Sequence, residues 1–247
     1  MSEFIYTFQK GFNYSQDGPG NRLVYHLSGC NLFCPWCSNP EGLKRTNNSQ
    51  KHTVNEIYNE ILSCRTMFFD NGGVTFTGGE VSLQTTAVLK LCEMLKNENI
   101  STCIETNASL KDTEKLIGVV DYMIADFKSP DKEILKSVTG ADIETIKENL
   151  LKRALTKKYL LIRIPLINNF NTGIDNAVSF AKFFKELTEK SKSDNICIEI
   201  LTYHEYGKDK YKTENLEYNF SDGFVKQSQV DILKSELEKS NLKIIKT

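Results

Sequence analysis

Two hydrophobic patterns alternate along the chain. Short runs rich in β-branched and aromatic residues predict strands, and longer segments of helical period between them predict helices. The strand candidates are residues 22–27, 74–77, 101–106, 122–126, 160–164 and 196–201. The helix candidates are residues 54–69, 85–96, 112–119, 143–155 and 175–189, followed by an amphipathic stretch at 227–240 and an apolar run at 242–245. This alternation predicts an α/β fold with a parallel sheet that curls into a complete or a partial barrel, and we expect a partial (β/α)6 TIM-like barrel.

Polar residues recur at the ends of the expected strands. In chain order these are Cys30, the Gly78-Gly79-Glu80 run, Thr106 with Asn107, Asp126 with Lys128, Arg163 within the fifth strand, and His204. In β/α barrels the chemistry lies at the carboxyl ends of the strands, because the βα loops converge there. Loops are polar in general, which accounts for any one of these residues but poorly for the whole set. We therefore expect the functional site at this end of the sheet.

Composition and charge narrow the class of protein. The chain has 247 residues, with Lys+Arg 31 against Asp+Glu 32 and a net charge of -1. This length suits a single domain over residues 1–247, and the balance gives no reason to expect nucleic acid or an anionic membrane as partner. The first ten residues lack a basic start followed by an apolar run, and no stretch reaches the length of a membrane span. We expect a cytoplasmic protein.

The 7 cysteines are unevenly distributed. Cys30, Cys34 and Cys37 fall in one short segment, whereas four others occur singly, namely Cys64, Cys92, Cys103 and Cys197. An odd number without a secretion signal argues against a disulfide framework. The four single cysteines are expected to be reduced and mostly buried, because a free cysteine packs as a small apolar residue.

The clustered cysteines have the spacing Cys-x3-Cys-x2-Cys. Three thiolates in one loop can hold three corners of a cubane iron–sulfur cluster, which leaves the fourth iron without a protein ligand and therefore reactive. The alternative is zinc, which needs a fourth ligand that His26 could supply. Pro35 and Trp36 make a poor zinc-knuckle turn, and His26 is more readily explained as a packed strand residue.

At these residues the chain resembles the radical S-adenosylmethionine (SAM) superfamily, whose hallmark is Cys-x3-Cys-x-aromatic-Cys. The resemblance implies that Cys30, Cys34 and Cys37 hold a [4Fe–4S] cluster and that Trp36 lies against the adenine of SAM. It also implies reductive cleavage of SAM to a 5′-deoxyadenosyl radical that abstracts hydrogen from a substrate. Gly78-Gly79-Glu80 resembles the superfamily's Gly-Gly-Glu motif, in which the glycines bring main-chain groups close to the ligand. Glu80 would then accept from the ammonium of SAM.

Further motifs resemble the glycyl radical enzyme activating enzymes over nearly the whole chain. Asp17-Gly-Pro-Gly20 with Arg22 is similar to that family's signature, and the partner's glycine loop is expected beside Asp17. By resemblance, SAM contacts are implied at Trp36, Ser38, Asn39, Gly78, Gly79, Glu80, Glu105, Asn107, Asp126, Lys128, Arg163 and His204. A monovalent cation near Glu105 is the weakest of these expectations, because relatives often carry the shorter Asp there.

The resemblance further indicates the compact type of activating enzyme. Residues 39–53 contain no cysteine, so there is no inserted ferredoxin-like segment. The electron would come from flavodoxin or ferredoxin, and the substrate would be a backbone glycine of a partner glycyl radical enzyme under anaerobic conditions. The chain is expected to be a monomer. A radical SAM enzyme acting on a small molecule or a short peptide is the alternative.

Overall fold

The protein is described by a computed structural model of residues 3–246, which divide into two compact units. The first unit contains residues 3–31, 41–106 and 110–124, and the second contains residues 32–40, 107–109 and 125–246. The division falls within strand β6 (Tyr122–Asp126) and within the segment that carries the clustered cysteines.

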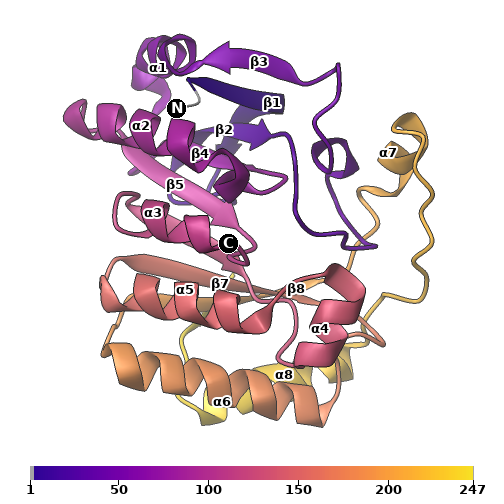
Figure 1. Ribbon diagram of the computed structural model, residues 1–247. Helices are drawn as coiled ribbons and strands as arrows, with labels where there is room; N and C mark the ends of the chain where they lie inside the picture. The colour runs from indigo at the N-terminus through magenta and orange to yellow at the C-terminus, as the bar shows by residue number, and fades with distance from the viewer. Residues whose placement is uncertain (1–2, 247) are drawn as a thin grey trace. The chain divides into compact units, whose positions relative to one another are not determined.

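The first unit is built on a mixed sheet. Its strands are β1 (Phe4–Tyr14), β2 (Asn21–Leu27), β3 (Gln50–Thr53), β4 (Gly73–Gly78) and β5 (Ser101–Thr106), in the order β3-β1-β2-β4-β5. β2, β4 and β5 run parallel, whereas β1 pairs antiparallel with both β2 and β3. The helices are α1 (Val54–Ser63), α2 (Thr85–Asn97) and α3 (Glu114–Ile117), and α2 packs against both of the others (Figure 1).

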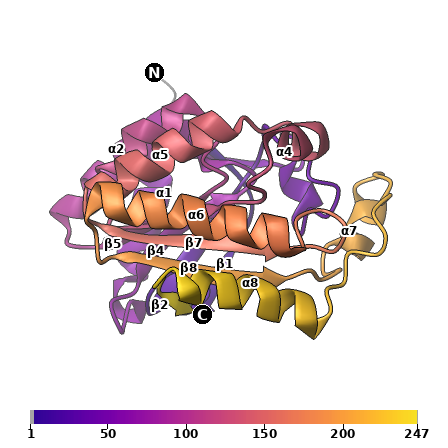
Figure 2. The same ribbon diagram turned by 90° about the horizontal axis from the view of Figure 1, so that it is seen from below.

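The second unit holds the parallel strands β7 (Tyr159–Leu166), β8 (Ile196–Thr202) and β9 (Ile244–Ile245). Its helices are α4 (Lys132–Thr139), α5 (Ile143–Leu155), α6 (Ile174–Ser191), α7 (Lys208–Thr213) and α8 (Gln227–Lys239). α6 packs against α5 and against α8, which runs alongside it in Figure 2. Phe127 anchors the core of this unit through ring contacts with Phe180, Phe183 and Phe184 at 4.8–5.9 Å.

The predicted strands and helices are present, and their local causes are visible in the sequence. In β2 every side chain except His26 is buried, which explains its continuous apolar run. α1 begins at a capping box, in which the Thr53 hydroxyl accepts from the Glu56 N–H and the Glu56 carboxylate accepts from the Thr53 N–H. The sheet registers put the expected strands β2, β4 and β5 side by side, as the parallel pattern predicted.

Two helix predictions were too long. The segment expected as a helix over 112–119 is α-helical only at Glu114–Ile117, after a 3-10 turn at Lys111–Thr113. The segment expected as a helix over 54–69 leaves the α-helical form at Ser63 and continues as a 3-10 turn at Arg65–Met67. Met67 and Phe69 are 46% and 50% exposed, so no buried face exists there to sustain a longer helix. Two other 3-10 turns lie at Pro40–Gly42 and Val81–Gln84.

Four elements were not predicted, namely β1, β3, α4 and α7. β1 is half-exposed and interrupted by polar residues such as Gln9, Lys10 and Asn13, so it gives no apolar run. α4 and α7 are only 8 and 6 residues long. Between residues 3 and 246, no helix combines the length and apolar character that crossing a membrane requires.

Candidate active site

The clustered cysteines lie on a loop with little secondary structure of its own. Cys30 belongs to the first unit, where its N–H donates to Leu43 O at 3.1 Å. Cys34 and Cys37 belong to the second unit, and the Cys37 N–H donates to Cys34 O at 3.2 Å. All three are half-buried and none is in a disulfide. Within either unit, the described residues contain no group of three His, Cys, Asp or Glu side chains that could hold a metal ion.

The other cysteines follow the prediction with one exception. Cys92, Cys103 and Cys197 are at most 2% exposed, as expected of small packed residues. Burial raises the pKa of the Cys92 thiol, which therefore stays protonated. Cys64 was expected to be buried but is half-buried at the carboxyl end of α1, where the helix gives way to a 3-10 turn.

Two aromatic side chains near the thiols are packed. Trp36 is 9% exposed, with Phe170 at 4.6 Å and Phe220 at 5.2 Å between ring centroids. In the first unit, His26 contacts the ring of Phe8 at 5.6 Å, the packed-strand role that the sequence favoured over zinc ligation. The adenine contact expected of Trp36 stays a prediction.

Gly78 and Gly79 bring the end of β4 against the backbone that leads to Cys30. A Cβ on Gly78 would lie 2.3 Å from Leu27 N, and one on Gly79 would lie 2.0 Å from Gly29 O. The Gly79 N–H donates to Leu27 O at 2.8 Å, and the Glu80 N–H donates to Gly29 O at 2.7 Å. The pair therefore positions the start of the cysteine loop through backbone hydrogen bonds, a role that any side chain there would prevent.

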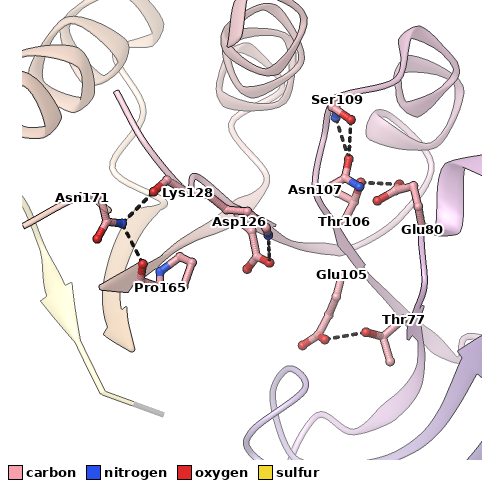
Figure 3. A network of polar contacts seen from close by, with 10 residues as sticks. All are labelled: Thr77, Glu80, Glu105, Thr106, Asn107, Ser109, Asp126, Lys128, Pro165 and Asn171. Atoms are coloured by element: carbon pink, nitrogen blue, oxygen red, sulfur yellow. Dashed lines mark hydrogen bonds and ion pairs between the residues drawn. The ribbon is translucent and has the colours of Figure 1, made fainter. Parts of the chain in front are cut away.

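The two glutamates predicted as site residues, Glu80 and Glu105, lie in the first unit and accept hydrogen bonds from threonine hydroxyl groups. Glu80 is fully buried, and its Oε1 accepts from the Ser82 N–H at 3.0 Å and the Thr106 hydroxyl at 2.6 Å. The Glu105 Oε2 accepts from the Thr77 hydroxyl at 2.7 Å (Figure 3). These hydrogen bonds fix the direction of the buried Glu80 carboxyl group.

An ion pair follows β6 in the second unit. Lys128 Nζ lies 2.5 Å from Asp126 Oδ2, with side chains that are 11% and 39% exposed (Figure 3). Asn171 holds the backbone in place, because its Nδ2 donates to Lys128 O and to Pro165 O, both at 2.7 Å. The sequence predicted that Asp126 and Lys128 both engage SAM, which stays a prediction, and the structure pairs the two side chains with each other. The Lys128 ammonium is largely buried, so it is already partly removed from water. An anionic ligand could therefore form a charge-assisted hydrogen bond with it.

Three other predicted site residues, Arg163, Asn107 and His204, lie in the second unit, and each has its own hydrogen-bond partner. Arg163 Nε donates to Glu199 Oε2 at 2.9 Å in an ion pair whose side chains are 11% and 2% exposed. Asn107 Oδ1 accepts from the Ser109 N–H at 2.9 Å and its hydroxyl at 2.7 Å (Figure 3). His204 Nδ1 accepts from the Tyr206 N–H at 3.3 Å, and burial lowers the pKa of the imidazole.

His204 also lines a cavity of about 670 Å³ in the second unit. The wall is formed by residues 199–206 together with Phe224 and Lys246. Sequence reasoning missed Glu199, because a glutamate in the middle of an apolar strand has no motif around it. The only available signal was an acidic residue inside a run of Ile, Cys and Leu, since a buried charge requires a partner.

The Asp17-Gly-Pro-Gly20 turn is fixed by a buried arginine. Arg22 is 0% exposed, and its NH1 donates to Pro19 O at 3.1 Å. Arg22 Nε donates to the Thr75 hydroxyl at 2.7 Å, and that hydroxyl donates to Asp17 O at 2.6 Å. The Asp17 carboxylate accepts from Asn13 Nδ2. Gly18 and Gly20 have φ of +115° and +69°, a conformation that suits glycine.

Parallel strands with helical crossovers, together with a loop of three cysteines that form no disulfide, suit an α/β enzyme with a thiolate-held redox centre. The chain belongs to the radical SAM superfamily, whose family model matches residues 24–180. It is 33% identical over 215 residues to the pyruvate formate-lyase-activating enzyme of Staphylococcus aureus (strain USA300). This match covers 83% of the chain and 84% of the relative.

Solved structures share the fold. A domain of pyruvate-formate lyase-activating enzyme from Bacteroides vulgatus matches with a TM-score of 0.55 at 21% identity, covering 70% of this chain and 98% of that one. Streptococcus suis SuiB matches with a TM-score of 0.64 at 16% identity, covering 90% and 48%. Coproporphyrinogen III oxidase from Escherichia coli matches with a TM-score of 0.56 at 16% identity, covering 88% and 52%. The fold predicted from the sequence, a partial β/α barrel of the radical SAM type, is confirmed.

The protein is therefore a radical SAM enzyme, and its cofactors are the predicted [4Fe–4S] cluster and SAM. The chain's own donors fit the cluster, since Cys30, Cys34 and Cys37 are half-buried and form no disulfide, and thiolates are the ligands that iron–sulfur clusters take. The paired charges of Asp126 and Lys128 suit an amino acid moiety, which carries both signs.

Proposed function

We propose that the protein is a glycyl radical enzyme activating enzyme that acts on a backbone glycine of a partner protein. The observation that carries the proposal is the loop of three cysteines at Cys-x3-Cys-x2-Cys spacing, none of them in a disulfide, in a chain that matches a pyruvate formate-lyase-activating enzyme over most of both lengths. The Asp17-Gly-Pro-Gly20 turn supports the activase over the small-molecule alternative.

In this proposal Cys30, Cys34 and Cys37 hold the cluster. Bound together, the cluster and SAM supply one-electron reductive cleavage of a carbon–sulfur bond, and the protein orients the reactants and excludes water. The residues proposed to bind SAM are Trp36, Ser38, Asn39, Gly78, Gly79, Glu80, Glu105, Asn107, Asp126, Lys128, Arg163 and His204. Glu80 would meet the ammonium and Lys128 the carboxylate of the methionine moiety, because each is a largely buried charge of the required sign.

Asp17 is proposed to border the path of the partner's glycine loop. Its backbone carbonyl is held by Thr75 and its turn by Arg22, so the carboxylate is presented on a fixed main chain. The remaining proposals are an electron from flavodoxin or ferredoxin, a monomeric protein in the cytoplasm, a single radical SAM domain over residues 1–247, and a monovalent cation near Glu105.

The test uses electron paramagnetic resonance. Anaerobically reconstituted protein, a reductant, SAM and a glycyl radical enzyme encoded beside it are mixed, and the spectrum is recorded. A doublet from a glycine α-hydrogen, absent when the partner's glycine is replaced by alanine, is the expected result. The alternative would replace this proposal if SAM were consumed rapidly with a small molecule and no radical appeared on the partner protein.

A further inference from the structure

Residues 207–211 of the second unit run against the loop that carries Cys34 and Cys37. A Cβ on Gly207 would lie 2.4 Å from Cys37 O and 2.8 Å from Ser38 Cα. The φ of Gly207 is −83°, which any residue can adopt. Glycine is therefore required here by lack of space, and the two backbones are in direct contact.

Lys210 reaches the same loop from α7. Its Nζ donates to Ser38 O at 3.2 Å and to Asn39 Oδ1 at 3.3 Å. The other lysines of this helix behave differently, because Lys208 pairs with Glu205 and Lys212 lies 3.8 Å from Asp209. Lys212 is 83% exposed at its side chain, whereas Lys210 is half-buried. Of the three lysines in α7, Lys210 is the one that donates to the residues that follow Cys37.

Tyr211 holds the loop on the other side of Cys37. The residue is 5% exposed, and its hydroxyl donates to Pro35 O at 3.5 Å. Burial raises the pKa of Tyr211, so the phenol keeps its proton and remains a donor. Tyr218 packs edge-on against its ring at 4.9 Å, which fixes the ring direction.

The loop needs this support because it has few contacts of its own. Residues 32–39 form no helix or strand, and among their backbone hydrogen bonds are Cys37 N–H to Cys34 O and Phe33 N–H to Thr139 O. A cluster requires its thiolates at fixed separations, and unrestrained loop residues would have to be ordered on binding at a cost in conformational entropy. Contacts at Pro35 and Ser38 restrain the chain on both sides of Cys37.

We propose that Lys210 and Tyr211 are positioning residues for Cys34 and Cys37, acting through the backbone of residues 35–39. The inference rests on the proposed role of these cysteines as cluster ligands. Lys210 acts on the carbonyl and side chain that follow Cys37, and Tyr211 acts on the carbonyl between the two cysteines. The positive charge of Lys210 additionally favours the reduced cluster, which carries one more negative charge.

The test compares Lys210→Gln and Tyr211→Phe with Lys212→Gln, which removes the same charge from the same helix without touching the loop. Full-length protein is reconstituted anaerobically, and the rate of iron loss to a chelator and the midpoint potential of the cluster are measured. Circular dichroism of the cluster-free chains checks folding. Tyr211→Phe keeps the buried ring, so it remains informative if Lys210→Gln folds poorly.

Both variants are expected to lose iron at least about threefold faster than Lys212→Gln, the effect of about 0.6 kcal/mol of lost positioning. Lys210→Gln should also have a more negative midpoint, by about 59 mV if reduction is disfavoured about tenfold. Faster iron loss with an unchanged midpoint would still support positioning. Equal iron loss in all three variants would overturn it, with or without a shifted midpoint. If the unsubstituted chain took up no cluster, the proposed function itself would fail.

Discussion

Thr75 connects Arg22 to the turn at Asp17. The Arg22 guanidinium donates from Nε to the Thr75 hydroxyl at 2.7 Å, and the same hydroxyl donates to Asp17 O at 2.6 Å. Arg22 is fully buried and also donates to Val74 O at 2.7 Å and Ser101 O at 3.1 Å. A buried cation held by neutral oxygens depends on all of them, because none can be replaced by water.

We therefore expect Thr75→Val to destabilise the protein by about 1–3 kcal/mol, the cost of leaving buried partners unsatisfied. Valine has nearly the shape of threonine, so packing is preserved while the link is lost. For a chain of this size 1 kcal/mol corresponds to about 2–4 °C in melting temperature. Calorimetry on the cluster-free chain measures the shift. Thr66→Val at an exposed position of the same unit is the control, and an equal shift in both would contradict the role of Thr75.

The clustered and single cysteines should respond differently to serine. Cys34→Ser is expected to lower the iron content of reconstituted protein well below about four per chain and to abolish SAM cleavage, because three thiolates leave no spare ligand. Cys197→Ser should retain iron, since that thiol is packed at 2% exposure in β8. Iron and sulfide analysis measures both. Full cluster content and activity in Cys34→Ser would refute the central assignment.

His204 should make stability depend on pH. Burial lowers the pKa of its imidazole in the folded chain, so the unfolded chain binds the proton more readily. The stability that comes from burying the neutral His204 side chain is therefore fully present above about pH 6.5, the usual histidine pKa. It is lost as the pH falls through the lowered pKa of the folded chain. Denaturant unfolding of cluster-free protein between about pH 7.5 and 5 should show a smaller loss in His204→Gln than in the original chain. Identical pH profiles would disprove the assignment.

The strand order and most element boundaries could be predicted because the parallel strands are buried on both faces. Leu23, Val24 and Tyr25 in β2 give an unbroken apolar signal of this kind. β1 was missed because it is antiparallel and half-exposed, with Lys10 and Asn13 in its second half. α4 could have been found, since Asp131 caps its first turn and Gly140 ends it with φ +82°.

The site was predictable as a set of motifs but not as a set of contacts. Asp126 and Lys128 could be placed at the end of one strand, but their ion pair with each other was not predicted. The pairing of Arg163 with Glu199 and of Glu80 with Thr106 could not be predicted either. In each pair the partner comes from another strand, so the contact depends on the sheet register. The contacts of Lys210 with Ser38 and Asn39 span about 170 residues of sequence, beyond any local pattern.

The pair of Lys128 and Asp126 should decide how tightly SAM binds. Lys128 is the less exposed member, at 11% of its side chain, so a ligand carboxylate would meet an ammonium already largely removed from water. A charge-assisted hydrogen bond of this kind contributes about 1.5–3 kcal/mol.

Lys128→Ala is therefore expected to weaken SAM binding at least about tenfold while the cluster content stays unchanged. Asp126→Ala should weaken it as well, because Lys128 then loses the carboxylate that orients it 2.5 Å away. The exposed Lys132, at the start of α4, offers a matched control, since Lys132→Ala removes the same charge four residues further along. Isothermal titration of SAM into anaerobic protein measures all three affinities. Affinities that matched the Lys132→Ala control in both site variants would show that neither residue meets SAM, and the ion pair would then be only structural.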